Sequence, residues 1–288
     1  GTDIDQSDAS GRTALMIAAG RNHARYVQTL LTAGAALTLE DRDGLSAAHY
    51  AARGGHAPLL DGLLAAGMVR GRARLLNLAV ASGDIDTVER VLALTGPDVH
   101  ANGSPGALAL AVTLDSGVLV ERLLAAGADP LSRDGYGHTP LWHAIGRNDT
   151  GLIEKLAAAH AIADSDGNTP LHRAAILGDL GAIAVLTARG ADLGAVNSSG
   201  ETPLIAALKA RQYGTLEALV NAGADVNYRN EAGQSALMIA AYRGDDTAVT
   251  TLLALGADPS LQSPDRRNAE DIADELGHTL VVAVLRQH

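Results

Sequence analysis

The stretch from Asp166 to Ala175, DGNTPLHRAA, is the clearest copy of a pattern that returns along most of the chain. Asp166 and Gly167 are typical of a tight turn, in which glycine takes the positive φ that other residues avoid. Thr169 suits the N-cap of a helix, and Pro170 suits its first position, where no backbone N–H is needed. The stretch therefore predicts a turn that leads directly into a helix.

Copies of this pattern define a repeat. The first starts at Asp8 and the second 33 residues later at Asp41, and others begin near residues 74, 102, 134, 164, 197 and 230. A second apolar stripe follows in each copy, such as Val249, Leu252 and Leu253, which indicates a second helix. We therefore expect residues 1–288 to form a single elongated stack of helix pairs, with residues 263–288 as a shortened C-terminal cap.

Two copies depart from the regular pattern. The third keeps its helical pattern from Leu75 to Leu94 but lacks the turn before it. Between the fifth and sixth copies, the equivalent residues Leu141 and Leu171 lie 30 rather than 33 positions apart. We expect the missing turn to let the second and fourth copies splay near residues 68–75.

Composition and charge restrict the classes of partner. Hydrophobic residues make up 47% of the chain but aromatic residues only 2%, so the core has to be built from closely packed Ala, Leu, Val and Ile. The formal net charge of −11 repels phosphate groups, which argues against nucleic acids and anionic membranes as main partners. We expect a protein partner instead.

Cysteine usage and the start of the chain bear on compartment. The chain has no cysteine, which excludes disulfides, thiolate nucleophiles and cysteine-based zinc sites. No run approaches the roughly 18 apolar residues that a membrane span requires, and no signal peptide is recognisable. Of the 22 Lys and Arg residues only two are lysines, a bias typical of a GC-rich bacterial gene. The compartment stays open between the bacterial periplasm and the cytoplasm, and the start at Gly1 rather than Met favours the periplasm.

The repeat resembles a known family. TPL stands at residues 139–141, 169–171 and 202–204, and GAD closes four copies at 127, 190, 223 and 256. With the period of 33, these motifs are similar to ankyrin repeats and cover roughly residues 8–288. The resemblance implies an all-α solenoid of stacked helix-turn-helix units with short β-hairpin loops. It also implies a concave surface that binds a protein, no cofactor, and a chain that is monomeric apart from its partner.

The expected binding strip follows the hairpin tips and the ends of the first helices. Its most aromatic part lies in the fifth copy, around Tyr136 and Trp142, and aromatic and Arg side chains often carry interface energy. Trp142 also occupies the place of the consensus histidine, so packing against the next repeat is the alternative reading for this residue. The predicted partner-binding residues are Arg42, Asp43, Leu45, Arg53, Tyr136, His138, Trp142, Arg147, Ser165, Asp166, Asn168, Gln234, Tyr242 and Arg243.

The ten histidines do not predict an active site. His49 and His172 fall on the TPLH histidine, which the resemblance assigns to a bond with the neighbouring turn. His23, His56 and His278 fall at the entry of a second helix. No HExxH, phosphate-binding loop or GxSxG elbow is present, and the repeats leave no insertion in which to build a catalytic site. We therefore predict a protein that is not an enzyme.

Several functions remain open at this point. The first is a protein-interaction module that binds a folded partner, in its sharper form a bacterial inhibitor or immunity protein. The alternative is a small-ligand or metal-binding repeat protein, with His138, His143 and Asp166 as ligands if they converge. A third is that the chain is the repeat segment of a larger effector or enzyme.

Overall fold

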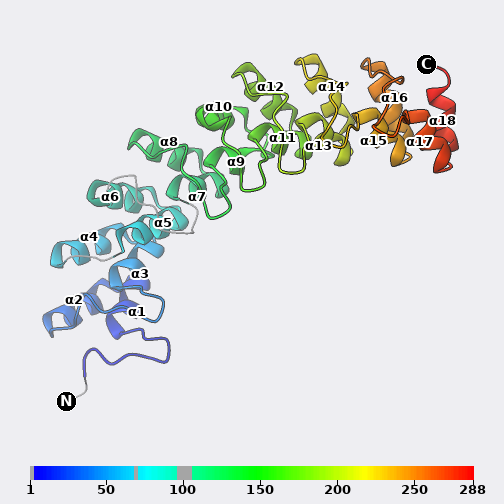
Figure 1. Cartoon of the computed structure of the whole chain (residues 1–288). Helices are drawn as coiled ribbons and strands as arrows, with labels where there is room; N and C mark the ends of the chain where they lie inside the picture. Colours follow the sequence, from blue (N-terminus) through cyan, green and yellow to red (C-terminus); the bar gives the residue numbers. More distant parts are fainter. Residues whose placement is uncertain (1–2, 68–70, 96–105) are drawn as a thin grey trace. The chain divides into compact units, whose positions relative to one another are not determined.

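The computed structural model describes residues 3–67, 71–95 and 106–288. It divides into two compact units, Gly1–Gly135 and Tyr136–His288, which we call the N-terminal and the C-terminal unit. Each is built from pairs of short helices (Figure 1). The expected all-helical architecture is confirmed across the described residues. The single stack over residues 1–288 stays a prediction.

The N-terminal unit has two rows of helices. The first helices of its repeats pack in sequence, α1 on α3, α3 on α5 and α5 on α7, and α4 packs on α6 in the second row. The helices are α1 (Ala14–Gly20), α2 (Ala24–Thr32), α3 (Ala47–Arg53), α4 (Ala57–Ala66), α5 (Arg72–Ser82), α6 (Ile85–Thr95), α7 (Ala107–Thr113) and α8 (Gly117–Ala125).

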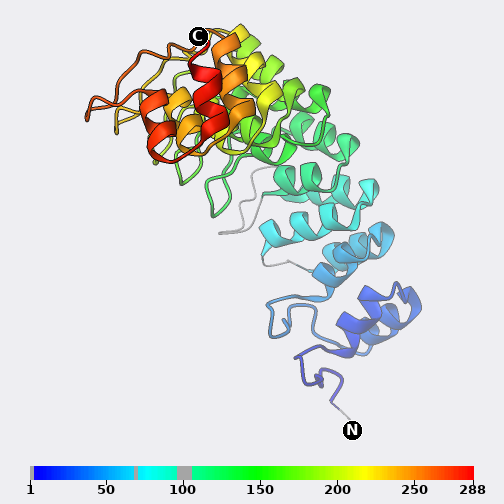
Figure 2. The same ribbon diagram turned by 90° about the vertical axis from the view of Figure 1, so that its right-hand side faces the viewer.

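The C-terminal unit repeats this arrangement. Its first helices, α9, α11, α13, α15 and α17, pack side by side, and its second helices form a parallel row (Figures 1 and 2). The elements are α9 (Pro140–Ala144), α10 (Thr150–Leu156), the 3-10 turn η1 (Ala157–Ala159), α11 (Pro170–Leu177), α12 (Leu180–Ala188), α13 (Pro203–Lys209), α14 (Tyr213–Asn221), α15 (Ala236–Tyr242), α16 (Asp246–Ala254), α17 (Ala269–Glu275) and α18 (Thr279–Leu285).

The first helices begin where the sequence predicts. The hydroxyl of Thr169 accepts a hydrogen bond from the N–H of His172, and Pro170 is the first helical residue. Thr139 and Thr202 cap α9 and α13 in the same way. Each threonine satisfies one of the N–H groups that the first turn of a helix leaves without a partner.

The core is a set of thin layers between neighbouring helix pairs. Ala174 and Ala175 are completely buried in α11, and Leu171 beside them is too. The small side chains of the two alanines let α13 pack closely on this helix, and leucines fill the remaining space. The helices themselves are short, and none among the described residues is long and apolar enough to cross a membrane.

The hairpins that precede the first helices share a polar device. The carboxylate of Asp164 accepts hydrogen bonds from the N–H groups of Asp166 and Asn168, at 2.9 and 2.8 Å. Neighbouring hairpins are joined by the backbone, because the N–H of Ser198 donates to the carbonyl of Asp166 at 2.9 Å. In Figure 2 the hairpins of the C-terminal unit extend to one side of the helices. The tips are therefore held in register.

Gly167 illustrates how closely these hairpins approach. Its φ is +78°, and a Cβ there would lie 3.0 Å from the backbone nitrogen of Ser198. Gly190 has a similar φ of +82° but open space around it. We expect Gly167→Ala to lower the free energy of unfolding more than Gly190→Ala does. In both variants an alanine is forced into the left-handed conformation, which costs about 1–2 kcal/mol. Only Gly167→Ala adds a clash with the backbone of the next hairpin. Chemical denaturation checks this, and equal losses would contradict it.

The two irregular repeats have different outcomes. In the third repeat, residues 68–70 lie outside the described residues. Because α5 packs on both α3 and α7, its helices remain part of the stack, and the splay predicted near residues 68–75 stays a prediction. In the fifth repeat, α10 passes into η1 and His160 has a φ of −58°. Other repeats have a glycine with positive φ at this point. Histidine disfavours a positive φ, and the chain forms a 3-10 turn here instead.

Candidate functional site: a groove between hairpins and first helices

A pocket in the C-terminal unit shows where hairpins and first helices face each other. It has a volume of about 170 Å³ and receives side chains from the hairpin arms and from the ends of α15 and α17. The lining residues are Ala232, Gln234, Tyr242, Ser263, Asp265, Arg267, Ile272, Glu275 and Leu276. Tyr242 and Glu275 are each the seventh residue after the N-cap of their helix, Ser235 and Asn268.

The same register forms a pocket in the N-terminal unit. This pocket has a volume of about 220 Å³ and is lined by Arg12, Met16, Ile17, Gly20, Arg21 and Tyr50. Ile17, Gly20 and Arg21 are the fourth, seventh and eighth residues after the N-cap Thr13. The fourth, seventh and eighth positions after the N-cap therefore line a pocket on α1 and on α17, as the seventh does on α15. We call the surface that these positions form on the first helices of the C-terminal unit, together with the hairpin arms, the groove.

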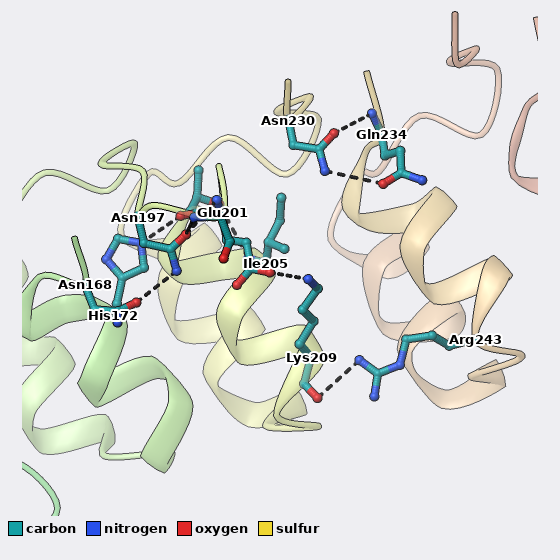
Figure 3. Close-up of polar contacts among 11 residues, drawn as sticks. Asn168, His172, Asn197, Glu201, Ile205, Lys209, Asn230, Gln234 and Arg243 are labelled. Atoms are coloured by element: carbon teal, nitrogen blue, oxygen red, sulfur yellow. Dashed lines mark hydrogen bonds and ion pairs between the residues drawn. The ribbon is translucent and has the colours of Figure 1, made fainter. Parts of the chain in front are cut away.

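Polar contacts tie the hairpin arms to the helices that form the groove. Glu201 of one hairpin pairs with Lys209 at the end of α13 (Figure 3). The guanidinium of Arg243 donates to the carbonyl oxygen of Lys209 at 3.2 Å. On the hairpin side, the Asn197 amide donates to Oδ1 of Asn168 at 2.9 Å. The first contact joins a hairpin to the helix of its own repeat and the other two link successive repeats, so the groove is a preorganised surface.

An aromatic stack lies at the start of the C-terminal unit. The His138 ring lies parallel to that of Trp142, with centroids 4.7 Å apart, and Tyr136 stacks on the histidine at 5.8 Å. The Arg173 guanidinium lies 5.0 Å from the Trp142 ring centroid, within cation–π range. The predicted group of aromatic and charged side chains is thus assembled, and Arg173 belongs to it as well.

The predicted strip is partly brought together in the groove. Gln234 and Tyr242 line the pocket, and Arg243 lies next to them at the end of α15. Tyr242 and Tyr136 are 63% and 72% exposed. Six further predicted residues are exposed. In this unit they are Arg147, Ser165 and Asp166, and in the N-terminal unit Arg42, Asp43 and Arg53.

Two predicted contact residues are corrected by their burial. Leu45 is only 4% exposed, because it directly precedes the N-cap Ser46 and packs into the core. Trp142 is 8% exposed beneath His138 and Arg173, so the alternative reading of this residue as a packing residue is the one that its burial supports. Asn168 is half-buried, since its side chain bonds to the next hairpin.

Sequence reasoning missed several groove residues. Arg173, Ile176 and Leu177 are the fourth, seventh and eighth residues after the N-cap Thr169, and Lys209 is the seventh after Thr202. Leu276 is the eighth after Asn268 and is 48% exposed. Counting from each capping residue would have found them. The search for aromatic and charged tips did not, because it did not follow one helical face.

A hydrogen-bonded pair of polar side chains holds a hairpin in the N-terminal unit. Tyr50 donates its hydroxyl to Asp41 at 2.6 Å, and burial, followed by this bond, raises the pKa of Tyr50 to about 12. Burial opposes ionisation of Asp41, but hydrogen bonds from Tyr50 and from backbone N–H groups lower the pKa of its carboxyl. This pair holds the second hairpin on its helix.

The consensus histidines act as expected. His172 is buried, and its Nε2 lies 2.8 Å from the carbonyl oxygen of Glu201 in the next hairpin. His49 bonds to the carbonyl of Gly71 at 3.3 Å in the same way. Burial lowers the pKa of both imidazoles below their ordinary value. These histidines therefore connect repeats as neutral side chains.

The metal alternative does not assemble as expected. His138 and His143 are close, with ring centroids 5.7 Å apart. Asp166, the third expected ligand, does not join them in a group of ligand atoms within 4.8 Å of one another among the described residues. Asp166 lies at the tip of the following hairpin, where its backbone bonds to Asp164 and Ser198. The two expected histidines therefore converge, but the carboxylate that joins them is that of Asp134 and the expectation for Asp166 is wrong.

Comparison with known proteins adds family information. A protein-family model described as ankyrin repeats matches three segments, residues 1–74, 108–197 and 178–263. The crystal structure of the ankyrin repeat domain of Bcl-3, described as a unique member of the IkappaB protein family, matches with a TM-score of 0.66. The two share 30% sequence identity, and the match covers 73% of this chain and 97% of that one.

Curated relatives match shorter parts of the chain. L-asparaginase of Dirofilaria immitis is 32% identical over 54% of this chain and 28% of its own length. The ankyrin repeat protein YahD of Escherichia coli (strain K12) is 30% identical over 56% of this chain and 86% of its own length. The chain spans less than a third of the length of the first curated relatives that it matches.

Proposed function

The chain belongs to the ankyrin-repeat family, and from this premise we propose that it is a non-enzymatic module that binds a folded protein partner in the groove of its C-terminal unit. Its similarity to the ankyrin repeat domain of Bcl-3 supports a binding role. The similarity to L-asparaginase covers 28% of that protein, so the activity of that enzyme is not transferred to this chain.

The observation that carries this proposal is the exposure of large apolar side chains along the groove. Tyr242 and Leu276 are 63% and 48% exposed at the edge of the pocket, and Ile176 and Leu177 are exposed on α11. Such side chains on a preorganised surface, next to arginines, have the composition of interface hot spots. A partner that covers them removes this apolar area from water.

The mode of action follows from the size of such a surface. When a partner fills the groove, the chain covers part of the partner's surface and blocks other molecules from reaching it. In a bacterial cell this describes an inhibitor or immunity protein, and the similarity to the Escherichia coli protein YahD supports the bacterial setting. As part of the proposal, the chain acts as a monomer and does not bind nucleic acid, in keeping with its net charge of −11.

The test replaces an exposed tyrosine inside the groove. We expect Tyr242→Ala to weaken the complex by about 1–2 kcal/mol, or roughly five- to thirtyfold in Kd, because the variant loses a large rigid contact. The immobilised full chain is exposed to a lysate of the cells that carry the gene. Retained proteins are identified by mass spectrometry, and the leading one is purified and titrated by calorimetry.

A second exposed tyrosine provides the control. Tyr26 is 67% exposed but lies on α2, a second helix outside the groove. Tyr26→Ala should bind as tightly as the unchanged chain. The proposed function would be overturned if Tyr242→Ala bound the partner as tightly as Tyr26→Ala does. It would also be overturned if no protein bound the chain saturably.

A further inference from the structure

We propose that the groove of the C-terminal unit recognises an acidic segment of its partner that carries apolar side chains between its carboxylates. This inference rests on the proposed function and adds the chemistry of the partner. It is carried by the distribution of charge over the first helices, by the way in which the arginines are held, and by the apolar residues between them.

Four of the five first helices of this unit carry no acidic residue although the protein is acidic, whereas the fifth, α17, contains Glu270, Asp271, Asp274 and Glu275. The chain as a whole has a net charge of −11, yet α9, α11, α13 and α15 contain no Asp or Glu. Arg173 and Lys209 lie within these helices, Arg243 follows α15 directly, and Arg147 lies three residues after the end of α9. Four cations therefore follow one another along the groove, and such a row attracts carboxylates over the distance of a Debye length.

The arginines are held in place by backbone carbonyls. Arg173 Nε donates to the carbonyl of Trp142 at 3.3 Å, and Arg243 donates to that of Lys209 at 3.2 Å. Each of these bonds reaches back to the preceding first helix. A guanidinium has five N–H donors in a planar fork that matches a carboxylate, so a bond to a carbonyl leaves the fork suited to a second acceptor. Fixing it beforehand lowers the entropy lost on binding.

Lys209 is already engaged, because it pairs with Glu201 of the adjacent hairpin. The Lys209 side chain is 49% exposed and that of Glu201 is 15% exposed, so the pair is open to solvent on the lysine side, where ion pairs are weakened by water and salt. An incoming carboxylate can therefore share or replace Glu201. This pair thus leaves Lys209 available to a partner while keeping it positioned.

Apolar side chains alternate with these cations. Ile176 and Leu177 lie between Arg173 and Lys209 in the order of the repeats, and Tyr242 adjoins Arg243. The row ends at Leu276 in the pocket beside α17. A segment of carboxylates alone would leave these side chains exposed. A segment that also carries apolar residues covers them and pairs the cations.

The hairpin arms disfavour a nucleic acid in the same position. Asp166, Glu201 and Glu231 lie on successive hairpins beside the cationic helices. A phosphate backbone is charged at every nucleotide and would meet these carboxylates. A protein segment can place its acidic residues on the helix side only. The observations therefore favour a protein ligand.

The first part of the test is a selection from a random-peptide display library on the immobilised full chain. We expect the enriched peptides to contain Asp or Glu together with Leu, Ile or aromatic residues. Enrichment of basic peptides that Tyr242→Ala fails to bind would overturn this inference and leave the proposed function standing. If the enriched peptides bind Tyr242→Ala as well as the unchanged chain, or if no peptide is enriched, both this inference and the proposed function are overturned.

The second part reverses the charge of the groove with a matched control. Lys209→Glu with Arg243→Glu should lower the affinity for a selected acidic peptide about tenfold or more and abolish its dependence on salt. Lys155→Glu with Arg189→Glu changes the net charge equally, but on α10 and at the C-cap of α12, where both positions are exposed. Equal losses for the two double variants would reject recognition by the groove. Tighter binding of a single-stranded oligonucleotide than of the acidic peptide would also overturn the inference.

Discussion

Replacing Trp142 by alanine is expected to lower the free energy of unfolding by about 3 kcal/mol or more, whereas Tyr136→Ala is expected to change it by less than about 1 kcal/mol. Both residues belong to one aromatic stack, but Trp142 is 8% exposed and Tyr136 is 72% exposed. Removing the indole leaves a cavity beneath His138 and removes the surface on which Arg173 lies.

This difference is measured by urea unfolding followed by far-UV circular dichroism, because Trp142 is the single tryptophan and its variant has no indole fluorescence. Tyr136→Ala is the internal control. Equal stability of the two variants would mean that Trp142 is not a packing residue. If Trp142→Ala is unstable as expected, its loss of partner binding says nothing about direct contact. Tyr136→Ala is then the informative variant at this end of the groove.

Removing His172 is expected to cost about 2–3 kcal/mol, because its ring bonds to two repeats. Nδ1 lies 3.2 Å from the backbone nitrogen of Thr169, whose N–H donates to it. Nε2 therefore carries the proton and donates to the carbonyl of Glu201 at 2.8 Å. In His172→Ala the N–H of Thr169 and the carbonyl of Glu201 each lose a hydrogen-bond partner. Chemical denaturation at neutral pH measures the effect, and His288→Ala at the exposed C-terminus should leave stability unchanged.

The same histidine predicts how stability depends on pH. Burial lowers the pKa of His172 and of His49 below the ordinary value of 6.5, so the unfolded chain binds protons more readily than the folded one. The stability that these neutral rings provide is present above pH 6.5 and is lost as the pH falls toward their folded pKa. Replacing both histidines should flatten the plot of the free energy of unfolding against pH between pH 7 and pH 5. An unchanged slope would contradict the assignment.

The parts of the fold that could be predicted depend on short stretches of chain. Thr169 caps a helix and Pro170 opens it because each acts on residues a few positions away. The roles of His49 and His172 followed from the repeat pattern, since each places its ring against the next hairpin. The 3-10 turn before His160 was marked only by the missing glycine and the shorter spacing.

The candidate site was harder to predict because exposure depends on residues far away in the sequence. Leu45 and Tyr242 both read as surface residues, yet one packs into the core and the other lines the groove. Arg173 reads as an ordinary helix residue, and only the position of Trp142, 31 residues earlier, makes it part of the stack.

The sequence by itself determined the family, the repeat and the residues that begin each first helix, because caps and turns form between neighbouring residues. The tertiary structure decided which face of those helices stays open, and therefore which side chains line the groove. The reason is physical. Each helix is covered by its neighbours about one repeat away, and the residues left exposed are those that this packing does not reach.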